Sequence, residues 1–176
     1  QITIEGTFCV EQFERALNQI VQRHEAFRTS FHQINGEVVQ QIHGNVDFHM
    51  GYQKCDENTA QTIIHNFVQP FQLENAPLFR VTVLEITEEK FYILMDMHHI
   101  LYDEKSLDII FSEIWKLYRG ETLEVMKYHY KDYAVWQHDW LKGKQAQQMK
   151  RVGLRKMEHF NRTVLEAHRD QSCFDG

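Results

Sequence analysis

MHHILYDE, residues 97–104, is the stretch in which an apolar strand gives way to a helix. Residues 91–99 predict a strand, whose side chains point alternately to its two faces. His99 then ends a mostly apolar row, whereas His98 shares its face with Asp96. The two histidines are therefore not equivalent, and we expect His99 to lose more contact with water than His98.

The histidine pair admits three chemical interpretations. A histidine at a strand end is commonly a hydrogen-bonded structural residue, and the second interpretation is a general acid or base. In the third, His98, His99 and Asp103 are metal ligands. Neighbouring strand residues point to opposite faces, however, so an adjacent pair does not easily chelate one ion. No Cys/His spacing elsewhere supports a metal centre, and we predict none.

Size and composition are typical of a globular domain. The chain has 176 residues, of which 43% are hydrophobic and 25% are charged, enough for one core but not obviously for two. The formal net charge is −6 and no basic stripe is visible, which argues against a nucleic-acid partner. No apolar run reaches the roughly 18 residues of a membrane span, so no membrane partner is expected.

The cysteines and the first residue bear on the setting of the chain. Cys9, Cys55 and Cys173 are odd in number and widely spaced, which fits neither a disulfide framework nor a zinc site. This pattern suits a reducing cytosol, and a cytoplasmic protein is expected. No signal-peptide pattern is present. The chain opens on Gln1 instead of Met, which suggests a segment of a longer protein.

Periodicity and turn signals predict the order of the elements. Apolar residues at three- and four-residue spacing predict helices over 10–24, 57–68, 103–118 and 130–141. Alternating runs predict strands over 27–34, 37–42, 46–52, 78–86 and 90–98. Asn35-Gly36 is the strongest short hairpin signal, and Gly120 is expected to end the third helix. This order predicts an α/β fold, a two-layer sandwich of a mixed β-sheet with helices.

The last predicted helix is rich in aromatic residues, and the chain after it is polar. Its aromatic residues recur at helical spacing: Tyr130, Tyr133, Trp136 and Trp140. Such a pattern is more typical of a core than of a ligand cage. Residues 143–176 are rich in Gln, Lys, Arg and His and are predicted to be a polar tail. A helix is expected to continue to about residue 160, with the end of the chain frayed.

Residues 98–104 resemble the HHxxxDG motif of the condensation domains of nonribosomal peptide synthetases, which belong with the chloramphenicol acetyltransferase-like acyltransferases. Three further segments resemble the family in the same order: RHEAFRTSF at 23–31, APLFRV at 76–81 and YKDYAVWQ at 130–137. The four matches together cover about residues 2–141, which makes the resemblance specific. The last segment favours condensation over epimerisation, and L-configured donors and acceptors.

The resemblance implies one lobe of a chloramphenicol acetyltransferase-like fold, with residues 1–142 as the N-terminal lobe of a V-shaped pair. Carrier domains would deliver donor and acceptor on phosphopantetheine arms from opposite ends of a tunnel, so no directly bound cofactor is expected. The acceptor amine would attack the donor thioester, and an amide bond would form. The implied partners are carrier domains, an adenylation domain and the second lobe.

The motif also implies roles for single residues. His99 matches the second, catalytic histidine, either as a base or as a group that positions the amine, and His98 is expected to be structural. Asp103 is expected to cap the following helix or to pair with an arginine, for which Arg28 is one candidate. Breaking a buried pair on one side costs roughly 3–5 kcal/mol, enough to misplace His99.

Three departures from the family lower the expected activity. Position 104 is Glu where the motif has Gly, and we predict that Glu104→Gly raises the activity of a complete domain. The resemblance fades after about residue 149, and the second lobe is absent. The chain alone is therefore expected to have little or no condensation activity. A non-catalytic docking or scaffold lobe, a stand-alone acyltransferase and an epimerisation domain are the alternatives.

Overall fold

The computed structural model describes residues 1–144, 146 and 148–150. The predictions for the rest of the tail lie outside these residues. The chain forms two compact units, of which the first is Gln1–Lys127 and the second begins at Tyr128. The boundary predicted after residue 142 is drawn where the resemblance to the family ends. The division into units rests on contacts and does not test it, so that boundary stays a prediction.

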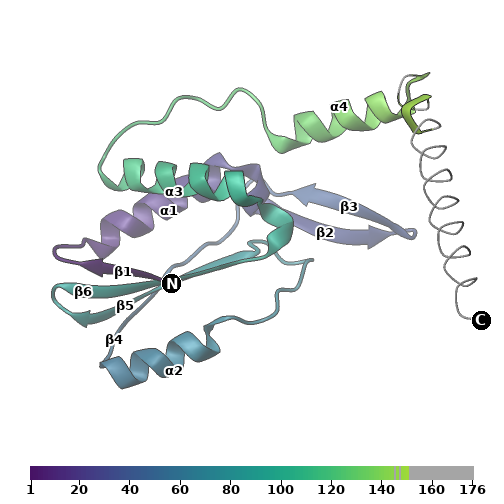
Figure 1. The fold of residues 1–176 in the computed structure, drawn as a ribbon. Helices are drawn as coiled ribbons and strands as arrows, with labels where there is room; N and C mark the ends of the chain where they lie inside the picture. Colours follow the sequence, from purple (N-terminus) through teal and green to yellow (C-terminus); the bar gives the residue numbers. More distant parts are fainter. Residues whose placement is uncertain (145, 147, 151–176) are drawn as a thin grey trace, which may run out of the picture. The chain divides into compact units, whose positions relative to one another are not determined.

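A four-stranded mixed sheet forms the centre of the first unit (Figure 1). Its strands, in spatial order, are β1 (Ile2–Glu5), β6 (Lys90–Met97), β5 (Phe79–Thr87) and β4 (Gly51–Lys54). β4 runs parallel to β5, whereas the other two pairs are antiparallel. The predicted mixed α/β class is thus confirmed. β1 was not predicted, although its alternating Ile2 and Ile4 are the signal of an edge strand that packs one face on the core.

Helices cover both faces of this sheet, as Figure 1 shows. α1 (Val10–Arg23) and α3 (Glu104–Tyr118) share one hydrophobic core with the odd-numbered apolar residues of β5 and β6. α2 (Glu57–Phe67) packs on the opposite face, against Leu84, Tyr92 and Leu94. The prediction was a two-layer sandwich of sheet and helices, whereas the structure has three layers, with the sheet between helices. The predicted alternation along β6 is confirmed as far as Met97.

The apolar stripe of α1 is buried in the core. Its predicted inward residues are each no more than 1% exposed: Phe13, Leu17, Ile20 and Val21. Fully burying a side chain of this kind stabilises the fold by roughly 1.5–3 kcal/mol. Phe13 also meets Trp115 of α3, with ring centroids 5.7 Å apart, so the stripe joins the two helices on this face.

The predicted hairpin forms a separate two-stranded sheet of β2 (Thr29–Ile34) and β3 (Glu37–Ile42). Asn35 and Gly36 have φ values of 53° and 84°, the left-handed conformations that a tight hairpin turn needs. The prediction of a strand from residue 27 was wrong at its start, because a short 3-10 helix, η1 (Glu25–Arg28), precedes β2. The strand predicted over 46–52 is also misplaced, since β4 begins only at Gly51.

The second unit contains α4 (Tyr130–Lys142), which ends one residue after the predicted helix. The prediction that its aromatic residues form a core was wrong: Tyr130, Tyr133, Trp136 and Trp140 are 38–65% exposed. Their rings instead follow one another along the helix, with successive centroids 5.7–6.4 Å apart. Helical spacing shows which residues share a face, but it does not show what covers that face.

Two further predictions concern cysteines and membranes. Cys9 and Cys55 are free thiols, and Cys173 lies outside the described residues. Within the part of the chain that the structure describes, no helix is both long enough and apolar enough to cross a membrane.

Candidate active site

The histidine pair lies where β6 ends and α3 has not yet begun. β6 ends at Met97, so the predicted strand over 90–98 is one residue too long, and His99 lies in a second 3-10 turn, η2 (His99–Leu101). His98 ends the strand because its Nδ1 accepts a hydrogen bond from the backbone N–H of Ile100, 3.2 Å away. Such local bonds from side chain to backbone favour a turn over continued strand pairing.

The exposure of the two histidines is the reverse of the prediction. His99 is exposed, whereas His98 is half-buried and its backbone N–H still donates to the Leu78 carbonyl at 3.0 Å. The His98 ring meets the ring of Phe71 edge-on, with centroids 6.2 Å apart. The strand alternation gave the wrong answer because it does not continue through the turn. The expectation that His98 is structural fits these contacts.

The partners of the two rings define opposite tautomers. A backbone carbonyl only accepts, so the 3.1 Å contact between His99 Nδ1 and the Tyr102 carbonyl places a proton on that nitrogen. His98 Nδ1 is instead an acceptor, and its neutral ring carries the proton on Nε2. Among the described residues, none hydrogen-bonds Nε2 of His99. A neutral, exposed His99 therefore presents a free lone pair to solvent.

Asp103 caps α3, which confirms one of the two roles predicted for it. Its carboxylate accepts hydrogen bonds from the Ser106 backbone N–H at 2.8 Å and from the Ser106 hydroxyl at 2.5 Å. The hydroxyl and then the backbone bond hold the pKa of Asp103 below its usual value. Glu104, exposed, is the first residue of α3, where its charge favours the helix dipole.

The ion pair suggested between Arg28 and Asp103 does not form. Arg28 instead donates to backbone carbonyls of two separate segments: Val21 and Gln22 at the end of α1, and His43 and Gly44 after β3. The first two are among the carbonyls that a helix C-terminus leaves without partners. Arg28 therefore connects the hairpin to α1. It has no contact with Asp103 through which it could position His99.

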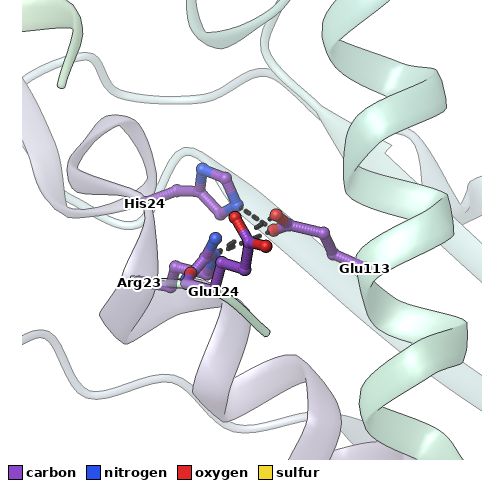
Figure 2. A network of polar contacts seen from close by, with 4 residues as sticks. All are labelled: Arg23, His24, Glu113 and Glu124. Atoms are coloured by element: carbon purple, nitrogen blue, oxygen red, sulfur yellow. Dashed lines mark hydrogen bonds and ion pairs between the residues drawn. The ribbon is translucent and has the colours of Figure 1, made fainter. Parts of the chain in front are cut away.

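Arg23 and His24, which begin the RHEAFRTSF segment, connect α1 to α3. Arg23 Nε and His24 Nε2 lie 3.1 Å and 2.6 Å from one carboxylate oxygen of Glu113, and Figure 2 shows the two side chains converging on it. Arg23 also donates to the Glu124 carbonyl at 2.6 Å. These contacts assign a structural role to a motif that the sequence offered only as a resemblance.

The sequence analysis did not predict the contacts that link His98 to Phe71 and Arg80. Arg80 lies 3.8 Å from the centre of the Phe71 ring and 3.2 Å from Asp96, its direct cross-strand neighbour. Phe71 in turn contacts His98. The pairing of Arg80 with Asp96 was open to prediction once β5 and β6 are read as a hairpin, because opposite charges favour facing positions. The contact with Phe71, which lies in a loop, carries no such signal.

The described residues hold no group of three or more His, Cys, Asp or Glu side chains that is arranged to bind a metal ion. Both Nδ1 atoms of the pair are engaged by backbone groups of the same turn. Nε2 of His99 has no hydrogen-bond partner among the described residues, so this nitrogen is open to accept a proton.

Comparison with known proteins gives a consistent family. A sequence model described as "Condensation domain" matches residues 1–164. Gramicidin S synthase 2 from Aneurinibacillus migulanus is 44% identical over 147 residues, which are 84% of this chain and 3% of that protein. Surfactin synthase subunit 2 from Bacillus subtilis (strain 168) is 44% identical over 135 residues, 77% of this chain and 4% of that protein.

A solved structure agrees with the fold. The starter condensation domain of rhizomide synthetase RzmA covers 83% of this chain with a TM-score of 0.72 and 21% identity, and the chain covers 38% of it. The chain therefore spans a small part of its curated relatives and somewhat more than a third of that solved domain. With a matching family model over most of its length, the chain belongs to the condensation-domain family of nonribosomal peptide synthetases and represents an N-terminal portion of the domain, with a chloramphenicol acetyltransferase-like fold.

Proposed function

We propose that this chain is the part of a condensation domain that supplies the proton-accepting group for amide-bond formation between two carrier-bound substrates. The observation that carries the proposal is the state of His99: its Nδ1 proton is held by the Tyr102 carbonyl, the residue is exposed, and Nε2 has no hydrogen-bond partner in the part of the chain that the structure describes. A general base needs this arrangement, with one nitrogen oriented and the other open to substrate.

The proposed step forms a C–N bond and breaks a C–S bond. The acceptor amine attacks the thioester carbonyl carbon of the donor, and the phosphopantetheine sulfur of the donor carrier leaves as a thiolate, which then receives from His99 the proton that the amine gave up. A free α-amine has a pKa of about 7.7–8.0, so a share of it is neutral near neutral pH and needs little activation. Its nitrogen becomes strongly acidic as the new bond forms, and Nε2 of His99 takes up that proton.

The other residues of the turn act on His99 instead of on the substrate. His98 caps η2 through its Nδ1, and Asp103 caps α3 through Ser106, so the turn is fixed at both ends. Arg28 holds the hairpin and α1 together and belongs to the scaffold. Glu104 is exposed at the first position of α3, where a carboxylate adds bulk and negative charge near the turn.

The setting forms part of the same proposal. The substrates arrive on the phosphopantetheine arms of carrier domains, so the chain needs no cofactor of its own. An adenylation domain and the second lobe complete the working assembly, which is cytoplasmic. The family to which the chain belongs supports this proposal, as do its relatives, which are far longer than the chain.

The test uses a complete domain that contains this chain. The segment of gramicidin S synthase 2 that aligns with the chain is replaced by the chain's residues, and transfer between a loaded donor carrier and a loaded acceptor carrier is followed by mass spectrometry of the intact carriers. We expect amide formation by this chimera and a loss of about 100-fold or more with His99→Ala. The 176-residue chain by itself is expected to be inactive, because it spans only 38% of the solved condensation domain that it matches.

A matched control is His65→Ala, which removes an exposed histidine of α2 and is expected to leave the rate unchanged. Equal rates for His99→Ala and His65→Ala would contradict the proposal. A chimera that binds both carriers normally but forms no amide, even after Glu104→Gly, would support the alternative of a non-catalytic docking lobe.

A further inference from the structure

Tyr102 provides both ring contacts of His99 among the described residues. Its backbone carbonyl lies 3.1 Å from His99 Nδ1. Its phenol ring lies against the imidazole, with centroids 4.8 Å apart and ring planes only 6° from parallel. Because the side chain of His99 is exposed, the surrounding core does little to restrict it, and Tyr102 is the main restraint on its orientation.

The two contacts restrict different degrees of freedom. The carbonyl selects the tautomer and fixes the edge of the imidazole that carries Nδ1, but it leaves the ring free to rotate about that hydrogen bond. The stacked phenol fixes the plane of the ring. With both the edge and the plane fixed, Nε2 has one direction in space, which a proton acceptor requires for a well-aligned transfer.

Tyr102 is itself well placed to act as a fixed surface. Its backbone is extended, with φ −149° and ψ 163°, and it connects η2 to α3. On one side, the Leu101 N–H donates to the His98 carbonyl at 3.0 Å, and on the other side Asp103 caps α3. Its side chain is half-buried, in contrast to that of His99. The restraint on Tyr102 is thus transmitted to His99.

We propose that Tyr102 is a positioning residue for His99, which holds the imidazole plane by stacking while its carbonyl selects the tautomer with a free Nε2. The inference deepens the proposed function and rests on it for its catalytic consequence. The phenol face also attracts the positive charge that His99 acquires when it takes up a proton. The motif carries no signal for this role, because position 102 is one of its unspecified residues.

The structural part is tested in the 176-residue chain by NMR of the His99 imidazole, whose signals are identified by their loss in His99→Gln. The ring current of Tyr102 is expected to shift the His99 ring protons upfield. Tyr102→Leu keeps the backbone carbonyl and removes the aromatic face, so the shift is expected to disappear. Tyr102→Phe keeps the face and is expected to preserve it. Tyr128→Leu, at a tyrosine that is 79% exposed, is the matched control.

The catalytic part is tested in the chimera with the same variants. Tyr102→Leu is expected to lower kcat by on the order of 10-fold with little change in KM, because it misdirects Nε2 without touching either substrate. Tyr102→Phe and Tyr128→Leu are expected to match the parent. In a His99→Ala background, Tyr102→Leu is expected to cause no further loss of kcat, because Tyr102 acts on the reaction only through His99.

Unchanged His99 ring-proton shifts in Tyr102→Leu would overturn the inference, and so would a Tyr102→Phe variant that behaves like Tyr102→Leu. An additional loss of kcat in the His99→Ala background would assign Tyr102 a role that does not pass through His99. The NMR arm does not depend on activity, so a failure of the proposed function, seen as a fully active His99→Ala chimera, is distinguishable from a failure of the stacking.

Discussion

Residues 23–29 and residues 98–103 both carry the family resemblance, but their side chains find partners at very different distances along the chain. Arg23 and His24 reach Glu113, about 90 residues further on. In the turn, by contrast, Nδ1 of His98, Nδ1 of His99 and the carboxylate of Asp103 all find partners within three residues. The first segment connects elements that are distant in the sequence, whereas the polar side chains of the second bond mainly within that segment and the first turn of α3.

This difference separates scaffold from chemistry. Contacts of half-buried groups hold α1, α3 and the hairpin together, and those of Arg23 and His24 with Glu113 join residues about 90 positions apart. In the turn, the polar side chains bond within the turn itself, and Nε2 of His99 has no hydrogen-bond partner among the described residues. The comparison predicts that substitutions in the first segment lower stability, whereas substitutions in the turn mainly change activity.

Phe27→Ala is the change with the largest expected effect on stability. Phe27 is 1% exposed and its ring lies 5.0 Å from that of Phe79, so truncation leaves a cavity in the core. The free energy of unfolding is expected to fall by about 3–5 kcal/mol, measured by urea unfolding of the chain. Ile34→Ala, at a hairpin residue that is 54% exposed, serves as the control. Equal losses of unfolding free energy for the two variants would contradict the role of Phe27 in stabilising the core.

Arg28→Ala is expected to cost roughly 1.5–3 kcal/mol, because it removes charged donors from carbonyls of α1 and of the segment after β3. Arg28→Lys is expected to recover only part of this loss, since one ammonium group does not span both segments. Arg15→Ala, at an exposed arginine of α1, is the matched control in the same urea titrations. Full recovery by lysine would show that charge alone matters at this position.

Glu104→Gly is expected to raise amide formation by the chimera by a few-fold, an effect on the barrier below about 1.4 kcal/mol. The change removes a carboxylate and its bulk from the first position of α3, beside the turn that holds His99. Glu104→Gln separates charge from bulk, because it keeps the size of the side chain. Equal rates for the parent and both variants would show that this departure from the motif has no functional weight.

Asp103→Asn tests the smallest effect, the charge of the helix cap. The native hydrogen bonds lower the pKa of Asp103, so its carboxylate contributes stability that is present above the unfolded pKa of about 3.9 and is lost as pH falls through the lower folded value. Asparagine also caps helices but does not titrate. The difference in urea midpoint between parent and variant is therefore expected to shrink from pH 6 to pH 3. A difference that is independent of pH would exclude the charge as its cause.

Predictions from the sequence succeeded where the physical cause is local. The Asn35-Gly36 turn, the Asp103 cap and the buried stripe of α1 each depend on residues a few positions apart. Predictions failed where the cause is distant or where a side chain competes with the backbone. The four carbonyls around Arg28 come from segments that no periodicity connects. The bond from His98 to Ile100 ended the strand before its alternation reached His99.

The candidate site was predicted less fully than the fold. The resemblance selected the correct turn, but strand alternation assigned His99 too much burial and offered no account of Tyr102. The aromatic face of α4 shows the same limit, since its spacing was read correctly and its burial was not. Burial and orientation depend on which elements meet in space, and that information is spread over the whole chain.

The most direct test of the central claim is the rate of amide formation per folded molecule in the chimera, compared between His99→Ala and Arg28→Ala. The account predicts that His99→Ala loses about 100-fold or more in rate while its urea midpoint stays at that of the parent. Arg28→Ala is predicted to keep its rate per folded molecule and to lose stability. A His99→Ala chimera that is as fast as the parent, or an Arg28→Ala chimera that is fully stable but slow, would contradict the division between scaffold and site.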